Sequence, residues 1–375
     1  MRVVVAPQEF KGSLTAAQAA EAIAAGVRDA LPDAAVDVVP MSDGGAGLVD
    51  ALLAARGGAR MTTRAHDPMM RLVDASWALL ADGAAAVEIA AASGLVLLTA
   101  EERDPLVATT RGTGELMSAA LDRGCARIIV GVGGSATVDG GAGAMQALGA
   151  RLFDAQGADL PPGGGPLLRL DRIDLSARDP RLAGAAIRVA CDVTNTLCGP
   201  QGAAAVFGPQ KGASPDGVRT LDAALQRFAE IVRRAAGVDL LPVPGGGAAG
   251  GLAAGLLVVA GATVEPGFTL VAEAVGLEAR VAAADLVITG EGRLDAQTAF
   301  GKTADGVAKL ARAHGRRVAI VAGSVDAAYD RAGSPFDVVE QATPAGMPLD
   351  EAMRRAGPLV REAATRVARA LAASP

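Results

Sequence analysis

The sequence predicts an α/β protein with two domains. Its 375 residues exceed the size at which a single hydrophobic core usually keeps growing, so two domains are expected. Hydrophobic residues make up 51% of the chain and glycine occurs 48 times, which is typical of wound strands and helices joined by glycine-rich turns. Apolar strand-like runs are also followed repeatedly by a loop and then by a helical pattern.

The start of the chain predicts a β-α-β-α unit. Strands are expected at residues 2–6 and 35–40, and helices at 15–30 and 47–55. A right-handed crossover makes the two strands parallel and gathers their following loops at the carboxyl edge of the sheet. Ligands bind at that edge in such folds.

Residues 59–94 follow a different pattern. Longer alternating segments at 61–65, 73–80 and 85–90 are separated by short turns containing Asp-Pro and Asp-Gly, which favours an antiparallel meander. A second, differently built domain is therefore expected to begin near residue 60.

Later segments return to single strands followed by helices. If the last three strands join the first two, residues 1–60 and 264–375 form one parallel-sheet domain, and residues 61–263 form a mixed α/β domain inserted in it. The Pro- and Gly-rich stretch at 241–251 fits either a linker or an active-site loop. The later strands are expected at 127–132, 186–191, 285–289, 317–322 and 336–342.

Charge and composition exclude several classes of protein. The chain has 35 basic and 41 acidic residues, a net charge of -6 and only 2% aromatic residues, which argues against nucleic-acid binding. The apolar stretches are too short and too interrupted by glycine to span a membrane. The three cysteines show no metal-type spacing, and the strand-like start resembles no signal peptide, so a cytoplasmic protein is expected. The sequence leaves a monomer and a homodimer both open.

The segment TGEGRLDAQTAFGKT at residues 289–303 leaves an apolar strand and enters a helical pattern through Gly-Lys-Thr. Ala296 stands where a P-loop requires its first glycine, so a true P-loop is absent. Lys302 nevertheless precedes a helix N-terminus, which favours an anion. Glu291 and Asp295 supply the hard oxygen atoms that Mg²⁺ binds together with phosphate and water. A helix start with solvated charges is the alternative.

A second loop, at residues 131–143, is rich in glycine and follows the apolar run Ile-Ile-Val. Glycines let successive amides turn toward one concavity, and Ser135 and Thr137 add hydroxyl groups, which suits a polyphosphate. Asp139 is a candidate for binding a metal ion or a ribose hydroxyl. A plain strand-to-helix connector is the alternative.

Two further loops follow the first two strands. Lys11 and Asp43 are expected at neighbouring carboxyl ends, although Ser13 also fits a helix N-cap and Asp43 a turn. Asp192 follows a later strand and is a candidate for accepting a proton from a substrate hydroxyl. A cysteine or serine nucleophile is not favoured, because His66 and His314 lie in no motif.

Together these loops resemble those of the bacterial glycerate kinase family, the type that includes glycerate 2-kinases. The likeness runs nearly end to end. Five groups of motifs carry it in order: Ala-Pro at 6–7 with Phe-Lys-Gly-Ser-Leu at 10–14; Asp-Gly-Gly at 43–45; Gly-Gly-Ser-Ala-Thr at 133–137 with Asp-Gly-Gly at 139–141; Cys-Asp-Val-Thr-Asn at 191–195 with Leu-Cys-Gly-Pro at 197–200; and Thr-Gly-Glu-Gly-Arg-Leu-Asp at 289–295 with Gly-Lys at 301–302.

The resemblance implies ATP- and Mg²⁺-dependent phosphorylation of D-glycerate, with the 2-hydroxyl favoured as the acceptor. It also implies a flavodoxin- or Rossmann-like domain that carries an inserted domain. The implied ATP-binding residues are Gly133, Gly134, Ser135, Ala136, Thr137 and Lys302. The implied metal ligands are Glu291, Asp295 and Asp43, and the implied catalytic and substrate-binding residues are Asp192, Lys11 and Arg293.

Some positions depart from the usual pattern of the family. Gln8 and Glu9 stand where Asp-Ser is frequent, Ala46 replaces a frequent Glu, Val138 a frequent Asn, and Thr196 a frequent Pro. A kinase of a related small hydroxy acid therefore stays an alternative. An NAD-dependent oxidoreductase lacks its G-x-G-x-x-G signature in the first βαβ unit, and a two-lobed ligand sensor would bind without forming ADP.

Overall fold

The computed structural model describes residues 1–294 and 303–372, and the chain divides into two compact units. Unit 1 comprises Met1–Asp43, Asp50–Arg56 and Phe268–Pro375, and unit 2 comprises Gly44–Val49 and Gly57–Gly267. The domain boundaries expected from the sequence, after residue 60 and before residue 264, stay a prediction.

Unit 1 contains a parallel sheet that joins strands from the two ends of the chain. Its described strands lie in the order β13-β12-β11-β1-β2, and every neighbouring pair is parallel. The prediction that the last three strands join the first two is therefore confirmed. The strands are β1 (Arg2–Val5), β2 (Ala35–Val38), β11 (Leu286–Leu294), β12 (Arg317–Val325) and β13 (Val338–Gln341).

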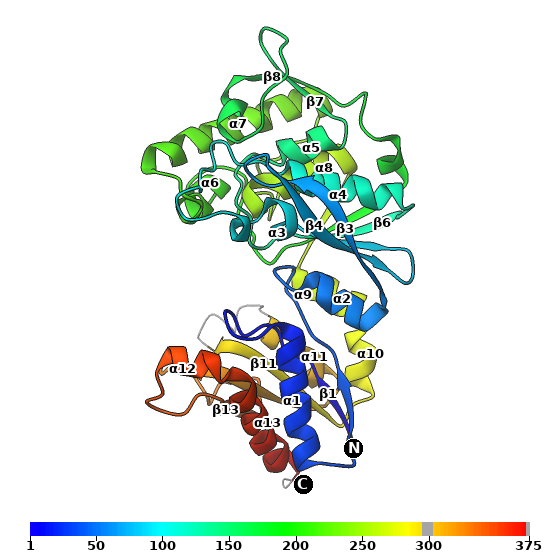
Figure 1. The fold of residues 1–375 in the computed structure, drawn as a ribbon, viewed down its shortest axis with the longest axis vertical. Helices are drawn as coiled ribbons and strands as arrows, with labels where there is room; N and C mark the ends of the chain where they lie inside the picture. The colour runs from blue at the N-terminus through cyan, green and yellow to red at the C-terminus, as the bar shows by residue number, and fades with distance from the viewer. Residues whose placement is uncertain (295–302, 373–375) are drawn as a thin grey trace. The chain divides into compact units, whose positions relative to one another are not determined.

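Helices α1 and α13 lie side by side on one face of this sheet (Figure 1). Alternate strand residues such as Val3, Val5 and Ile288 point into the core beneath these two helices. Thr15 caps α1, because its side chain accepts a hydrogen bond from the amide of Gln18, whose side chain accepts one from the amide of Thr15. The interpretation of Ser13 as the N-cap is wrong, since its hydroxyl donates to the carbonyl of Phe10. The helices are α1 (Ala16–Ala30), α2 (Leu48–Arg56), α9 (Gly267–Ala274), α10 (Leu277–Ala282), α11 (Thr303–Ala313), α12 (Leu349–Arg354) and α13 (Ala356–Ala372).

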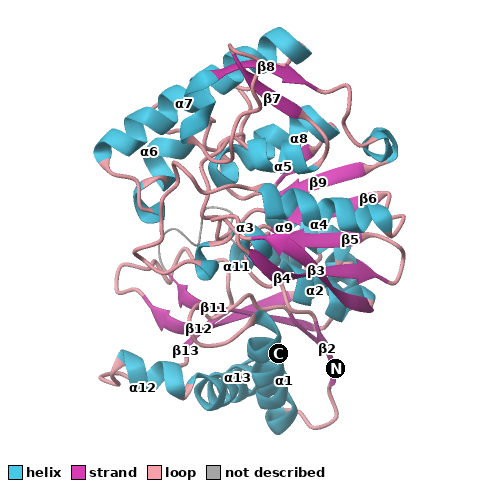
Figure 2. Ribbon diagram, turned by 45° about the horizontal axis from the view of Figure 1, so that its top comes forward, coloured by secondary structure: helices cyan, strands magenta, loops and turns pink. Residues whose placement is uncertain are grey.

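Unit 2 contains a mixed sheet whose described strands lie in the order β10-β9-β6-β5-β4-β3. The predicted antiparallel meander is found in β3, β4 and β5, whereas β5, β6, β9 and β10 pair in parallel. Figure 2 shows β3 to β6 and β9 as neighbouring strands. The strands are β3 (Gly58–His66), β4 (Leu72–Leu80), β5 (Ala85–Glu88), β6 (Arg127–Gly131), β9 (Ala186–Ala190) and β10 (Thr263–Glu265), with β7 (Arg151–Asp154) and β8 (Leu170–Asp174) forming a separate pair.

Helices and short 3₁₀ turns pack around this second sheet. Trp77 is buried in the core, and its indole N–H donates to the hydroxyl of Thr63 on the neighbouring strand. The α-helices are α3 (Ala90–Ser93), α4 (Arg111–Asp122), α5 (Ala142–Ala147), α6 (Ala203–Phe207), α7 (Pro215–Ala236) and α8 (Leu252–Ala260); the 3₁₀ turns used below are η4 (Pro209–Lys211) and η5 (Ala248–Gly251).

One predicted strand is longer than expected, and the structure decides between the two interpretations of the stretch at 241–251. The strand predicted at 285–289 continues to Leu294, because Arg293 pairs with Ser324 of β12 and extends the parallel ladder. The stretch at 241–251 lies within unit 2, where residues 245–251 are buried. It is therefore a packed segment of unit 2.

Candidate active site

The loop after β6 is held against two other backbone segments of unit 2. The amide of Ala136 donates to the carbonyl of Ser93 at 2.9 Å, and the amide of Leu95 donates to the carbonyl of Gly134 at 2.9 Å. The amide of Gly133 donates to the carbonyl of Gly44. Because these bonds fix the loop before any ligand arrives, its geometry is preorganised.

The glycines of this loop permit close backbone contact. A Cβ atom on Gly133 would lie 2.5 Å from the Cα atom of Gly45, and Gly134 has a φ of +75°, which side chains disfavour. Within the described residues, the amides of Gly134 and Ser135 have no hydrogen-bond acceptor. Of the five predicted ATP-binding residues at 133–137, Gly133 and Ala136 thus use their amides inside the protein.

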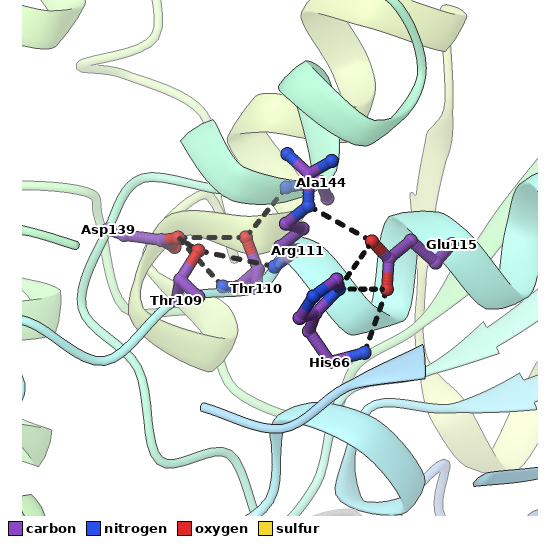
Figure 3. Close-up of polar contacts among 7 residues, drawn as sticks. All are labelled: His66, Thr109, Thr110, Arg111, Glu115, Asp139 and Ala144. Atoms are coloured by element: carbon purple, nitrogen blue, oxygen red, sulfur yellow. Dashed lines mark hydrogen bonds and ion pairs between the residues drawn. The ribbon is translucent and has the colours of Figure 1, made fainter. Parts of the chain in front are cut away.

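Asp139 holds the C-terminal part of the same loop through hydrogen bonds to its carboxylate (Figure 3). Its carboxylate is 0% exposed and accepts hydrogen bonds from the amides of Thr110, Gly141 and Gly143 and from the Thr110 hydroxyl. Burial raises the pKa of Asp139, and the bonds from Thr110 and the two glycine amides oppose that shift. The side chain is therefore an internal anchor, and the interpretation of Asp139 as a metal or ribose ligand is wrong.

A packed segment supports the loop from below. The amide of Gly140 donates to the carbonyl of Gly250 at 2.9 Å. A Cβ atom on Gly250 would lie 2.0 Å from the carbonyl oxygen of Thr137, so this contact requires glycine. The glycine-rich stretch after residue 241 thus packs closely against the loop.

Lys211 is a buried cation that sequence reasoning missed. It ends η4, its exposed fraction is 2%, and its ammonium nitrogen lies 2.6 Å from Ser135 Oγ and 2.7 Å from the carbonyl oxygen of Thr137. Burial lowers the pKa of Lys211 to about 7, although the charge of Asp139 acts to raise it. The local sequence Pro-Gln-Lys-Gly looks like a solvated turn, so its partners 74 and 76 positions away could not be predicted from it.

Asp192 follows β9 with an exposed side chain. Its Oδ1 atom accepts a hydrogen bond from the amide of Gly267 at 2.6 Å, which holds the carboxyl group in one orientation. The neighbouring thiol of Cys191 donates to the carbonyl of Val193, and burial raises the pKa of Cys191 and raises that of Cys198 to about 12. The raised pKa values of both thiols disfavour a thiolate nucleophile.

Each of the two histidines contacts a glutamate. The ring of His66 contacts the carboxylate of Glu115 at 2.8 Å, and Arg111 donates to the same carboxylate (Figure 3). The ring of His314 lies 3.4 Å from the carboxylate of Glu278. Both contacts are ion pairs or hydrogen bonds to glutamate, which agrees with the absence of a histidine motif.

In unit 1, the ends of β1 and β2 bring the charges of Lys11 and Asp43 close to Glu9. Burial and the charge of Asp43 raise the pKa of Glu9, while the charge of Lys11 lowers it. Lys11 itself is exposed, between buried Phe10 and Gly12, which has a φ of +78°. The predicted proximity of Lys11 and Asp43 at one sheet edge is thus present in the structure.

The end of β11 lies beside the Lys11 loop. A Cβ atom on Gly292 would lie 3.2 Å from the backbone nitrogen of Lys11. Glu291 is only 2% exposed and accepts a hydrogen bond from the side-chain amide of Gln8 at 3.1 Å. Arg293 has a 66% exposed side chain and an ion pair of 2.6 Å with Asp326. Glu291 and Arg293 are thus strand residues, whereas the sequence suggested an exposed loop.

Asp295 and Lys302 lie outside the described residues. Directly after them, α11 begins at Thr303, whose hydroxyl is buried without a hydrogen-bond partner in the described part of the chain. Two positions later, Asp305 is paired with Lys309 at 2.7 Å.

The carboxylates of unit 1 are chemically suited to Mg²⁺. Across residues 1–294 and 303–372, no group of three or more His, Cys, Asp and Glu side chains is arranged to hold a metal ion. Mg²⁺ in kinases is commonly held by one or two carboxylates together with phosphate oxygens and water. Glu291 and Asp43 are carboxylates of the kind that would supply these one or two protein ligands.

Among the described residues, no helix is long and apolar enough to cross a membrane.

Alternating α/β units with a preorganised loop of amides and hydroxyls are typical of enzymes that handle phosphorylated ligands. A comparison with sequence families identifies the class: this chain belongs to the glycerate kinase family, whose profile matches residues 3–372.

Individual relatives agree along nearly the whole chain. The sequence is 49% identical to glycerate 2-kinase of Escherichia coli strain K12, over 87% of this chain and 86% of that protein. It is 46% identical to glycerate kinase of Bacillus subtilis strain 168, over 100% and 97% of the two chains. A crystal structure from Salmonella typhimurium LT2, described as glycerate kinase 2, superposes with a TM-score of 0.90 at 46% identity and covers 100% of this chain and 98% of that one.

Proposed function

We propose that this protein transfers the γ-phosphoryl group of ATP to D-glycerate, with the 2-hydroxyl as the favoured acceptor. The observation that carries the proposal is the braced loop at 133–137, in a chain 49% identical to a glycerate 2-kinase. Membership in a kinase family favours this function over the oxidoreductase and ligand-sensor alternatives. The proposed location is the cytoplasm, where ATP is supplied, and cell fractionation with an antibody to the protein would test it.

The proposed nucleotide site uses preorganised donors. The amides of Gly134 and Ser135 and the hydroxyl of Ser135 would donate to phosphate oxygens, with Lys302 as a further cation. Preorganised donors stabilise developing negative charge without reorganising during the reaction. Glu291, Asp43 and Asp295 would hold Mg²⁺, which neutralises charge on the phosphates when bound.

The acceptor would be bound and deprotonated by side chains from different strand ends. Lys11 and Arg293 would bind the carboxylate of glycerate or the phosphoryl group, since a carboxylate substrate requires a nearby cation. The hydroxyl oxygen of glycerate bonds to the γ-phosphorus while the bond to the β–γ bridging oxygen breaks. Asp192 accepts the hydroxyl proton, and ADP and phosphoglycerate leave.

A coupled assay of ADP formation tests this function. Purified protein is given ATP and Mg²⁺ with D-glycerate, L-glycerate, glycolate or D-lactate. We expect kcat/KM for D-glycerate to exceed that for the other acids by ~10-fold or more. Glycolate and D-lactate lack a hydroxyl that the site would hydrogen-bond, and L-glycerate has the opposite configuration at its 2-hydroxyl. A preference for another hydroxy acid would establish the alternative substrate. ADP release that does not depend on any acceptor would contradict the proposal.

A further inference from the structure

The amino group of Lys211 joins the two ends of a three-residue segment in the braced loop. It donates to Ser135 Oγ at 2.6 Å and to the carbonyl oxygen of Thr137 at 2.7 Å. All three residues are buried, with Ser135 6% exposed and Lys211 2% exposed. A buried amino group is costly without partners, so these two acceptors account for its stable placement.

The contact with Lys211 controls which way the Ser135 hydroxyl points. A hydroxyl has a single proton, and the oxygen of Ser135 already accepts a hydrogen bond from the amino group. In its charged form the amino group has no lone pair to accept a hydrogen bond, so the Ser135 proton then points away from Lys211. It is then available to another acceptor, and the amides of Gly134 and Ser135 also have no acceptor among the described residues.

Lys211 also places a titratable charge directly behind the loop. The carboxylate of Asp139 is the charged group whose electrostatic effect reaches it, and it acts to raise the pKa. The backbone carbonyl and Cβ of Arg103 pack against Gly212, the next residue in the chain. Burial nevertheless lowers the pKa of Lys211 to about 7, so protonation of this amino group changes near neutral pH.

We propose that Lys211 is a positioning residue for nucleotide binding: it orients the Ser135 hydroxyl toward the phosphates and takes up a proton when an anionic nucleotide binds. This inference rests on the proposed kinase function, in which residues 133–137 bind ATP. Lys211 is assigned no contact with the nucleotide. It acts through Ser135 and Thr137 and through its charge behind the loop.

The first test compares Michaelis constants of wild type and Lys211→Met. Losing both hydrogen bonds is expected to raise KM for ATP by ~10-fold while KM for D-glycerate stays within ~2-fold. Ser135→Ala should also raise KM for ATP. The double variant should lose less free energy of ATP binding than the sum of the two single variants, because both substitutions remove the same Lys211–Ser135 interaction. A lower Tm with an unchanged KM for ATP, or additive effects in the double variant, would overturn the proposal.

The second test follows pH. In the wild type, KM for ATP should rise from about pH 6 to about pH 8.5, since Lys211 loses its charge over this range. The dependence should vanish in Lys211→Met and in Lys211→Gln, which keeps donors but has no charge. Arg219→Met is the matched control, because it removes an exposed cation from the same unit and should keep the wild-type profile. A flat wild-type profile would exclude the charged role.

The third test needs no turnover. Calorimetry of MgADP binding at about pH 7.5, in two buffers of different ionisation enthalpy, counts the protons taken up on binding. We expect uptake in the wild type and less in Lys211→Gln, which also serves if Lys211→Met does not fold. Equal uptake in both proteins, or none in the wild type, would overturn the proposal. A protein that binds MgADP with proton uptake but does not phosphorylate glycerate would instead contradict the proposed function alone.

Discussion

The candidate residues of the two units differ in how deeply they are buried. In unit 2, the loop at 133–141 is surrounded by buried groups, including Asp139 and Lys211, and by close backbone contacts. In unit 1, Lys11 and Arg293 project from strand ends with exposed side chains. The unit 2 loop is therefore built to keep one geometry, whereas the unit 1 cations can adjust to a ligand with little effect on folding.

The largest expected effect comes from removing the anchor of the unit 2 loop. Asp139→Ala leaves the amides of Thr110, Gly141 and Gly143 buried without their acceptor, which should lower the free energy of unfolding by about 3 kcal/mol. Urea denaturation measures this change. Asp154→Ala is the control, because Asp154 accepts two amide bonds in an exposed turn where water can replace it. If both variants lost the same free energy of unfolding, the buried loop around Asp139 would be no more dependent on its anchor than the exposed turn at Asp154.

A catalytic effect of similar size is expected at Asp192. Asp192→Asn should lower kcat by at least ~100-fold, or about 2.7 kcal/mol in activation free energy, because an amide cannot accept the hydroxyl proton. The amide oxygen can still accept the bond from Gly267, so unfolding in urea should change little. Steady-state kinetics supplies the measurement, and near-normal kcat would remove Asp192 from the role of general base.

Lys211 makes the stability of unit 2 depend on pH. Its pKa falls from 10.5 to about 7 on folding, so between these values the unfolded chain binds more protons than the folded one. Stability due to this group is lowest below about pH 7 and rises with pH, by at most about 1.4 kcal/mol per unit. Denaturation of wild type and Lys211→Met from about pH 7 to 9 should show the wild type gaining relative stability. A constant difference would show that Lys211 keeps its ordinary pKa.

The smallest effect on stability is expected in unit 1. Arg293→Ala breaks an exposed ion pair with Asp326, which should lower the free energy of unfolding by less than ~1 kcal/mol. The same variant should raise KM for D-glycerate, whereas Asp326→Ala should not, because only Arg293 is proposed to bind the substrate. A large stability loss in Arg293→Ala, or equal KM values in both variants, would remove the contrast between the units.

Much of the fold could be predicted because strand and helix patterns are local. The apolar run after Arg2, the helix expected at 15–30 and the antiparallel pairing of β3 and β4 all appear as predicted. The end of β11 could not be predicted, because Glu291 and Arg293 interrupt the apolar pattern while pairing with β12 continues the strand. Local polarity pointed to a loop, and tertiary pairing made a strand.

The candidate site was predicted less completely than the fold, for a related reason. Motif spacing pointed to residues 133–137 and to the strand ends near Lys11 and Glu291, since glycines, hydroxyls and charges at such ends are visible in sequence. The support of the loop depends on contacts between distant segments. Lys211 and Gly250 meet the loop 74 and 113 residues after Thr137, and nothing in their own neighbourhoods marks them as buried partners.

The central claim, phosphorylation of the 2-hydroxyl of D-glycerate by ATP, is tested most directly by proton-coupled phosphorus NMR of the product. A phosphate on the 2-oxygen couples to the single proton of a CH group and gives a doublet, whereas one on the 3-oxygen couples to a CH₂ group and gives a triplet. The account predicts ADP and a phosphate monoester doublet that appear together and require the enzyme and D-glycerate. A triplet would show that the enzyme phosphorylates the 3-hydroxyl instead. Inorganic phosphate without any monoester would contradict the account.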